Sequence, residues 1–306
     1  MNYLIYGAGG IGGCLAAFFA QGGKEVSLIA RGAHLQAIQR NGLVLETGHG
    51  TFAIPVKAAD QEHTTEKPDV IFVCVKGYSL DGIIPTLKRL CDAHTIVIPL
   101  LNLYGTGGRL QPELSPALVT DGCIYISSEI KAPGTLHMSG DIFRVVFGPR
   151  TPAEYRPELE EIARDLCDCG IEGVLSKIIQ RDALMKFAYV SSMAACGIYH
   201  DLPAAGMQVP GPAREDFQTL GREISALADA MGFPFPEDPI PRNLAILDAL
   251  APDASTSLKR DLDAGKPSEV DGLIFEVVRL GRAYGVATPA YDRVAAKLGF
   301  VWEEET

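Results

Sequence analysis

The stretch "YLIYGAGGIGGCLAAFFAQGG", residues 3–23, decides the fold of the first half of the chain. A short apolar run is followed by Gly7, Gly9 and Gly12 in G-x-G-x-x-G spacing, and then by an apolar helical segment. A strand, a glycine-rich turn and a helix in this order form the dinucleotide-binding fingerprint. Gly7 permits the tight turn, Gly9 lets the backbone approach a pyrophosphate, and Gly12 lets the helix pack closely on the strand. The N–H groups at the start of the helix would bind the phosphates.

The end of the second predicted strand indicates which dinucleotide binds. The run "EVSLIA", residues 25–30, is followed by Arg31, nineteen residues after Gly12. A carboxylate at this position favours a free ribose 2′-hydroxyl, whereas a cation favours a 2′-phosphate. Arg31 suits the phosphate because a guanidinium makes bidentate, charge-assisted hydrogen bonds. An exposed loop arginine is the alternative, and the sequence predicts NADP, used as NADPH.

Two more predicted strands end in polar residues. "VIFVCVKGYS", residues 70–79, contains Lys76, and "IVIPLLNLYGTG", residues 96–107, contains Asn102. Open α/β sheets bind ligands beyond the carboxyl ends of their strands. We therefore expect Lys76 near a cofactor phosphate and Asn102 near the nicotinamide ribose or the substrate. Each residue also fits ordinary turn chemistry, but the shared sheet edge favours a binding role.

A chain of 306 residues is long for one core, so two domains are expected. Apolar runs typical of buried parallel strands alternate with helical stretches up to about residue 177, and apolar residues then recur at helical spacing. The predicted strands are "YLIY", "EVSLIA", "VIFVCV", "TIVIPLL", "ALVTDGCIYIS" and "RVVFG". The prediction is an α/β fold, with a Rossmann-type parallel-sheet domain over 1–177 that binds NADP. An all-helical substrate and catalytic domain covers 178–306.

The composition excludes several classes of protein. A net charge of −11 argues against nucleic-acid binding, because phosphates are neutralised by clustered Lys and Arg. No apolar run approaches the ~18 residues that a membrane span needs. There is no secretory signal pattern, and the seven cysteines show no paired framework, so we expect reduced thiols in a cytoplasmic protein. The histidine and cysteine spacings predict no metal site.

One lysine interrupts an otherwise apolar run. "ALMKFAYVSSMAA", residues 183–195, carries Lys186 near its middle. The lysine would either extend its ammonium to water or face a negative or reactive group. Hydride transfer to a ketone places negative charge on the carbonyl oxygen, which an ammonium stabilises and protonates as a general acid.

Taken together, these segments resemble the ketopantoate reductases (2-dehydropantoate 2-reductases). "GAGGIGG", Arg31, "VKGYS" and "NLYG" are followed by "ALMKFA", "STSLKRDLDAGKPSEVDGL" and "GRAYGVATPAYDRV", so the resemblance covers nearly the whole chain. It implies a Rossmann domain and a helical domain with the active site in the cleft between them. The implied reaction is NADPH-dependent reduction of 2-dehydropantoate to pantoate, on the route to pantothenate and coenzyme A.

The resemblance also implies roles for individual residues. Lys186 corresponds to the catalytic lysine, Glu269 to its acidic partner, which also contacts the cofactor, and Ser257 to a substrate-binding serine. Asn102 corresponds to an asparagine that contacts both cofactor and substrate. The implied cofactor-binding residues are Gly7, Ala8, Gly9, Gly10, Ile11, Gly12, Arg31, Lys76, Asn102 and Glu269. As alternatives, Glu269 fits a helix start at Ser268, and Ser257 fits a helix N-cap.

The chain departs from the family pattern at two positions. The family usually has asparagines four and eight residues after the lysine, where this chain has Val190 and Ala194, with Ser191 and Ser192 nearby. Without these hydrogen-bonding side chains, the site would distinguish a hydroxylated acid less well from an analogue that lacks the hydroxyl. A related reductase of another small 2-oxo acid and a non-catalytic NADP-binding sensor therefore stay open as alternatives. The apolar final helices fit either completion of the core or a homodimer face.

Overall fold

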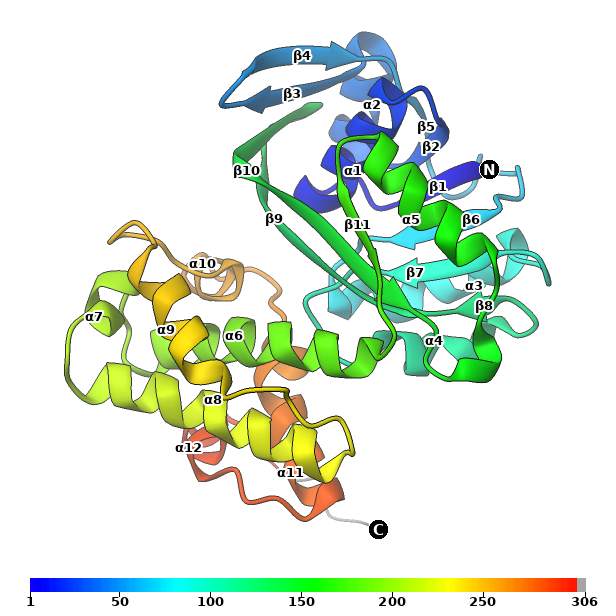
Figure 1. Ribbon diagram of the computed structural model, residues 1–306. Coiled ribbons are helices and arrows are strands. Elements are labelled where there is room, and N and C mark those ends of the chain that lie inside the picture. Colours follow the sequence, from blue (N-terminus) through cyan, green and yellow to red (C-terminus); the bar gives the residue numbers. More distant parts are fainter. Residues whose placement is uncertain (302–306) are drawn as a thin grey trace. The chain divides into compact units, whose positions relative to one another are not determined.

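A computed structural model describes residues 1–301 (Figure 1). The chain forms two compact units. The first contains Met1–Leu101 and Gly105–Ile179, and the second contains Asn102–Tyr104 and Gln180–Thr306, of which 302–306 lie outside the described residues. The short segment Asn102–Tyr104, which follows a strand of the first unit, thus groups with the helices of the second.

The first unit is built on a six-stranded parallel sheet. Its strands lie in the order β5-β2-β1-β6-β7-β8, which is 3-2-1-4-5-6 when they are counted along the chain. This is the Rossmann order, and the predicted fold class is confirmed. The strands are β1 Asn2–Tyr6, β2 Glu25–Ile29, β5 Lys57–Ala59, β6 Val70–Val73, β7 Ile96–Pro99 and β8 Leu118–Val119.

Helices connect and cover these strands. The central strands β6 and β7 are buried along their whole length, which explains their continuous Val and Ile content. The helical elements of this unit are α1 Gly10–Gln21, α2 Gly32–Asn41, η1 Gly77–Ser79, α3 Leu80–Leu90, α4 Thr106–Leu114, η2 Pro152–Glu154 and α5 Glu158–Asp168.

A second sheet in the same unit was not predicted. It has the order β11-β10-β3-β4, with β9 paired antiparallel to β10 as a long hairpin (Figure 1). Its strands are β3 Leu43–Thr47, β4 Gly50–Ile54, β9 Asp121–Ala132, β10 Thr135–Gly148 and β11 Glu172–Leu175. The predicted single strand "ALVTDGCIYIS" was wrong, because its residues divide between β8 of the first sheet and β9 of the second. In β4 the first four residues are exposed, so this strand lacks the apolar signal of a buried one.

The second unit consists of helices around its own apolar core. All the regular elements of its described residues are helical, as predicted. They are α6 Ile179–Tyr199, α7 Ala204–Gln208, α8 Pro212–Ala230, α9 Pro239–Asp248, α10 Ser257–Asp263, a π-helix Asp271–Phe275 (η3), α11 Glu276–Tyr284 and α12 Pro289–Lys297.

A buried carboxylate caps the last of these helices. Glu223 of α8 is 7% exposed and accepts hydrogen bonds from the backbone N–H groups of Ala290 (2.7 Å) and Tyr291 (3.1 Å) at the start of α12. Burial raises the pKa of Glu223, and the two N–H donors only partly oppose that shift. The carboxylate ties α8 to α12 by satisfying two backbone donors that no helical carbonyl can reach.

Replacing Glu223 by alanine should lower the free energy of unfolding by about 2–4 kcal/mol, because two buried N–H donors lose their acceptor. Urea denaturation measures this, and Asp229→Ala, which removes an exposed carboxylate from the same helix, should change stability by less than ~0.5 kcal/mol. A folded-state pKa above the unfolded value means that the proton-linked part of the Glu223 contribution is fully present at low pH. It is lost as the pH rises through the raised pKa. Glu223→Gln should remove this part of the pH dependence, and an unchanged profile would contradict the assignment.

Candidate active site

The glycine-rich loop between β1 and α1 is too tightly packed for side chains at two positions. Gly7 has φ +109°, and a Cβ atom there would lie 2.9 Å from the carbonyl oxygen of Cys74. A Cβ on Gly12 would lie 2.0 Å from the carbonyl oxygen of Gly7. Both obstacles are backbone atoms, so glycine is required at both positions for the loop to form.

Gly9 differs, because a Cβ built on it would have no neighbour within 4 Å. It is the N-cap residue of α1, which has neither a side-chain cap nor an acidic residue in its first turn. The start of a helix carries partial positive charge and N–H groups that point outward. The open space at Gly9 and this helix start fit an anion such as a pyrophosphate.

The second sheet explains two further glycines of the motif. A Cβ on Gly10 would lie 2.6 Å from the carbonyl oxygen of Ser128 in β9, and one on Gly13 would lie 2.4 Å from Leu136 Cδ1 in β10. Helix α1 therefore packs against the β9–β10 hairpin as well as against the parallel sheet. Gly10, predicted from the resemblance to contact cofactor, is thus also a packing position.

Two other loop residues were predicted to bind cofactor through the same resemblance. Ala8 is 7% exposed, whereas Ile11 is half-buried in the first turn of α1. Both lie between the glycines that set the backbone path of the loop.

Arg31 lies where β2 gives way to α2. It is exposed, has an extended backbone and forms the N-cap position of α2, followed by Gly32 with φ +58°. Helix α2 has no side-chain cap and no acidic residue in its first turn. A guanidinium and an uncapped helix start together form a cationic site at the end of β2.

Lys76 follows β6, the strand beside β1. The strand order of the parallel sheet changes direction between these two strands, and this crevice is where such sheets bind ligands. The backbone N–H of Cys74 donates to the carbonyl of Tyr6 (2.9 Å), so the residues leading to Lys76 lie beside the glycine-rich loop. Lys76 is half-buried and is the N-cap residue of η1.

In the helical unit, Lys186 contacts Asn102. The Lys186 Nζ atom donates a hydrogen bond to Asn102 Oδ1 at 2.7 Å, and both residues are half-buried. The ring of Tyr104 lies 6.3 Å from the ring of Phe187, so the segment that carries Asn102 also contacts α6 through aromatic side chains. Asn102 is neutral, so it orients the ammonium without neutralising it.

Glu269 precedes the π-helix of the same unit. Its residue is 5% exposed, and its carbonyl accepts from the N–H of Leu273 at 2.9 Å. Within the π-helix, a Cβ on Gly272 would lie 2.7 Å from the side chain of Leu103, the neighbour of Asn102. The absence of a side chain at Gly272 therefore lets the segment after Glu269 lie against the segment that carries Asn102. Single-turn π-helices of this kind are frequent at functional sites.

Ser191 joins α6 to the π-helix. Its hydroxyl donates to the carbonyl of Leu273 (2.5 Å) and lies 2.6 Å from the hydroxyl of Tyr291, which in turn is 3.5 Å from Ser192 Oγ. Ser191, Ser192 and Tyr291 are fully buried, and burial raises the pKa of Tyr291. The two serines near Lys186 in the sequence therefore contact buried groups of the helical core.

The two positions that depart from the family pattern have different environments. Val190, one turn after Lys186, is half-buried, whereas Ala194 is fully buried in the helical core. Of these two positions, only residue 190 is therefore partly exposed.

Ser257 is the first residue of α10 and is half-buried. The alternative prediction of Ser257 as the N-cap was wrong, because Thr256 is the cap and its hydroxyl accepts from the N–H of Lys259 at 3.2 Å. The capping interaction therefore does not account for a serine at position 257.

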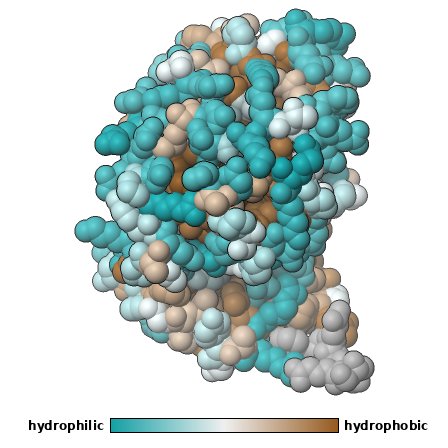
Figure 2. Space-filling view, turned by 90° about the vertical axis from the view of Figure 1, so that its right-hand side faces the viewer, coloured by the Kyte–Doolittle hydropathy of each residue, from teal (hydrophilic) through white to brown (hydrophobic). Residues whose placement is uncertain are grey.

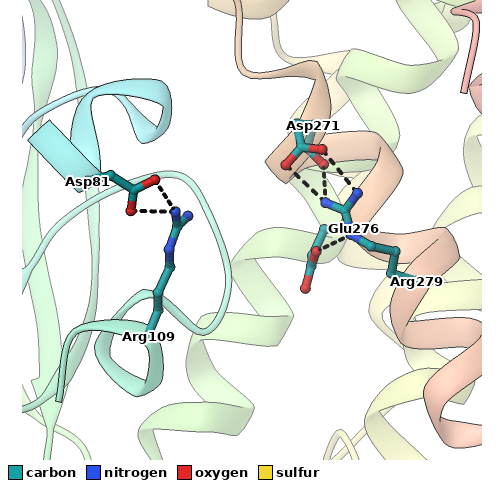
Figure 3. A network of polar contacts seen from close by, with 5 residues as sticks. All are labelled: Asp81, Arg109, Asp271, Glu276 and Arg279. Atoms are coloured by element: carbon teal, nitrogen blue, oxygen red, sulfur yellow. Dashed lines mark hydrogen bonds and ion pairs between the residues drawn. The ribbon is translucent and has the colours of Figure 1, made fainter. Parts of the chain in front are cut away.

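Figure 3 shows two ion-pair networks, one in each unit. In the first unit, Arg109 of α4 pairs with Asp81 of α3 at 2.6 Å. In the helical unit, Arg279 of α11 pairs with Asp271 (2.9 Å) and Glu276 (2.8 Å). The second network fixes the first residue of the π-helix to α11.

Other ligand classes were sought in the described residues. No group of three or more His, Cys, Asp or Glu side chains in residues 1–301 is placed to hold a metal ion. All seven cysteines are free thiols, and burial raises the pKa of Cys14, Cys91 and Cys196 to about 12. In the same part of the chain, no helix combines the length and apolarity that crossing a bilayer requires. On the face in Figure 2, hydrophilic residues predominate, with hydrophobic ones interspersed.

Comparisons with known proteins identify the family. Residues 3–152 match the model described as "Ketopantoate reductase PanE/ApbA", and residues 178–301 match its C-terminal counterpart. A 2-dehydropantoate 2-reductase of Mesorhizobium japonicum is 29% identical, and the alignment covers 97% of this chain and 96% of that protein. An uncharacterized oxidoreductase of Bacillus subtilis is 24% identical over 97% of this chain and 98% of its own length.

Solved structures agree with this result. A PanE/ApbA family ketopantoate reductase from Ralstonia eutropha JMP134 has a TM-score of 0.86 at 26% identity, covering 98% of this chain and 97% of its own. A D-mandelate dehydrogenase in complex with NADH and anilino(oxo)acetate shares the fold, with a TM-score of 0.88 at 20% identity and coverage of 98% and 97%. The matches to both family models, which together span nearly the whole chain, confirm the resemblance seen in the sequence. The chain belongs to the ketopantoate reductase PanE/ApbA family and is an oxidoreductase of that family.

Proposed function

We propose that this chain reduces 2-dehydropantoate to pantoate with NADPH, using Lys186 as the general acid. The observation that carries the proposal is the 2.7 Å hydrogen bond from Lys186 Nζ to Asn102 Oδ1. It brings together the two polar residues that the resemblance assigns to the reacting end of the substrate. Family membership and the 2-dehydropantoate 2-reductase names of relatives at 24–29% identity support the reaction.

The cofactor proposal is supported by the ends of β1 and β2. The pyrophosphate would bind over Gly9 at the uncapped start of α1, where a Cβ atom has no neighbour within 4 Å. The 2′-phosphate would bind Arg31 and the start of α2, where no acidic side chain in the first turn would repel it. Lys76 would add positive charge near the phosphates. When bound, the nicotinamide supplies the hydride.

Side chains of the helical unit would stabilise the negative charge that develops on the substrate and donate the proton. As hydride reaches the 2-oxo carbon, the Lys186 ammonium stabilises the developing alkoxide and transfers a proton to that oxygen. Asn102 holds the ammonium in place and would bind both cofactor and substrate. The buried carboxylate of Glu269 would counterbalance the positive charge of Lys186 and contact the cofactor, and the Ser257 hydroxyl would bind the substrate.

Replacing Arg31 by alanine should weaken NADPH binding by ~10–100-fold, because a charge-assisted pair to the 2′-phosphate is lost. NADH, which lacks that phosphate, should bind within about twofold of its wild-type affinity. Fluorescence titration of both cofactors measures the two dissociation constants. Arg40→Ala, which removes an exposed arginine from the same helix, is the matched control. Equal weakening of NADPH and NADH would refute the assignment.

A second candidate substrate is a more apolar 2-oxo acid. Val190 is half-buried one turn from Lys186, and the nearby serine hydroxyls are bonded inside the core. This face of α6 therefore offers an apolar side chain where a hydroxylated substrate would need a hydrogen-bonding partner.

A matched pair of substrates distinguishes the two candidates. 2-Dehydropantoate and 3,3-dimethyl-2-oxobutanoate differ by a single hydroxyl group, so kcat/KM for NADPH oxidation should be measured with both. A site that binds the hydroxyl should favour 2-dehydropantoate by ~100-fold or more. Preference for the deoxy analogue would establish the second candidate, and no turnover with either would refute both. Cofactor binding without turnover of any 2-oxo acid would instead favour a sensor.

A further inference from the structure

His34, in the first turn of α2, connects the β9–β10 hairpin to that helix. Its Nδ1 atom accepts a hydrogen bond from the backbone N–H of Gly134, in the turn of the hairpin, at 2.9 Å. Gly134 has φ +77°, and a Cβ there would lie 2.8 Å from the Cβ of Ala37 on α2. The carbonyl of Gly134 accepts from the N–H of Val44 in β3. The hairpin turn is thus held against α2, and one imidazole nitrogen is committed to it.

The other nitrogen of the ring lies beside the glycine-rich loop. Because Nδ1 accepts a hydrogen bond, the neutral ring carries its proton on Nε2. Nε2 is buried and makes no hydrogen bond of standard geometry with the described residues. Burial lowers the pKa of His34, and the Ala8 backbone opposes that shift, as an acceptor carbonyl does. Since Nδ1 accepts from Gly134, Nε2 is the nitrogen whose N–H can face this acceptor. A buried donor beside the Ala8 carbonyl would gain a hydrogen bond from a small movement of the loop.

Charged residues of the strands that pack against α2 form ion pairs with other residues. Glu46 of β3 pairs with Lys131 of β9 at 2.5 Å, and Lys57 of β5 pairs with Glu66 at 2.5 Å. Arg31 and Arg40 on α2, and Glu129 five residues before Gly134 on the hairpin, are exposed to solvent. Burial lowers the pKa of His34, the Ala8 backbone opposes that shift, and charged side chains are not among its causes. The imidazole is therefore neutral at pH 7.

We propose that His34 is a positioning residue for cofactor binding. When the pyrophosphate-binding loop moves to receive the dinucleotide, Nε2 of His34 donates to the Ala8 carbonyl and fixes the loop in that shape. It acts through the loop rather than by touching the cofactor, because its Nε2 atom is buried. This role requires the neutral imidazole, because a proton on Nδ1 would face the Gly134 N–H and break the hydrogen bond between them. The inference rests on the proposed NADP site.

The first test measures NADP⁺ affinity and turnover separately in the full chain. His34→Ala should raise the dissociation constant for NADP⁺ by ~10-fold and leave kcat at saturating NADPH within about twofold of wild type. His34→Gln should restore most of the affinity, because its amide can accept from Gly134 and donate to Ala8 at once. His49→Gln, which alters an exposed histidine of the same unit, should change neither value.

The second test uses pH. Isothermal titration with NADP⁺ from pH 5 to 8 should show the wild-type dissociation constant rising, relative to that of His34→Gln, as the pH falls below the His34 pKa. The ratio of the two constants cancels titration of the 2′-phosphate, because both variants bind the same ligand.

The outcomes separate this inference from the proposed function. Wild-type affinity in His34→Ala, a loss of kcat with unchanged affinity, or a pH-independent ratio between wild type and His34→Gln would each overturn the role of His34. Failure of the wild-type chain to bind NADP⁺ at all would instead overturn the proposed cofactor site.

Discussion

Replacing Lys186 by alanine should lower kcat by ~10²–10⁴-fold with little change in the affinity for NADPH. In the proposed reaction, the ammonium would supply both the charge that stabilises the developing alkoxide and the proton that completes the alcohol. Its hydrogen bond to Asn102 at 2.7 Å holds the ammonium in one orientation. Less side-chain entropy is therefore lost when substrate binds. Steady-state kinetics with a 2-oxo acid that the wild type reduces measures this effect.

Two further variants separate chemistry from packing. Lys186→Met keeps most of the apolar stem and removes the charge, so it should be as impaired as Lys186→Ala. Lys177→Ala removes an exposed lysine just before α6 and should leave turnover unchanged. Near-normal kcat in both Lys186 variants would remove this residue from the mechanism, and unchanged biological activity would revive a sensor role.

Two glycines of the same loop should respond in opposite ways to alanine. Gly12→Ala places a Cβ atom 2.0 Å from the Gly7 carbonyl oxygen, and neither backbone can move without breaking the β1–α1 turn. The free energy of unfolding should fall by ~3 kcal/mol or more. Gly9→Ala meets no atom within 4 Å at φ −66°, so stability should change by less than ~0.5 kcal/mol. NADPH affinity should nevertheless fall by ~10–100-fold, because the methyl group occupies the space that the pyrophosphate would approach.

Urea denaturation and NADPH titration of the two variants provide the comparison. Each variant serves as the control of the other, because the chemical change is the same and only the surroundings differ. Normal cofactor affinity in Gly9→Ala would show that the pyrophosphate binds elsewhere, and normal stability in Gly12→Ala would contradict the packing of the loop.

Local sequence patterns were sufficient for the parallel sheet and for the glycine-rich turn after its first strand. The glycine spacing after β1 and the apolar runs of β6 and β7 are short-range signals, because each residue's requirement comes from its immediate turn or its complete burial. The same patterns missed the second sheet. Strands such as β4 are largely exposed and pair with residues far along the chain, so their stability comes from partners that no local window contains.

The candidate site shows the same division. By itself, the sequence determined that a glycine-rich turn follows the first strand, that Arg31 follows the second strand, and that one lysine interrupts an apolar helix. Only the tertiary structure decided that Asn102 contacts Lys186, that Gly10 packs on β9, and that the serines beyond Lys186 are bonded inside the core. The physical reason is distance along the chain: a turn or a helix is specified by neighbours, whereas a hydrogen bond across 84 residues depends on how the helices pack.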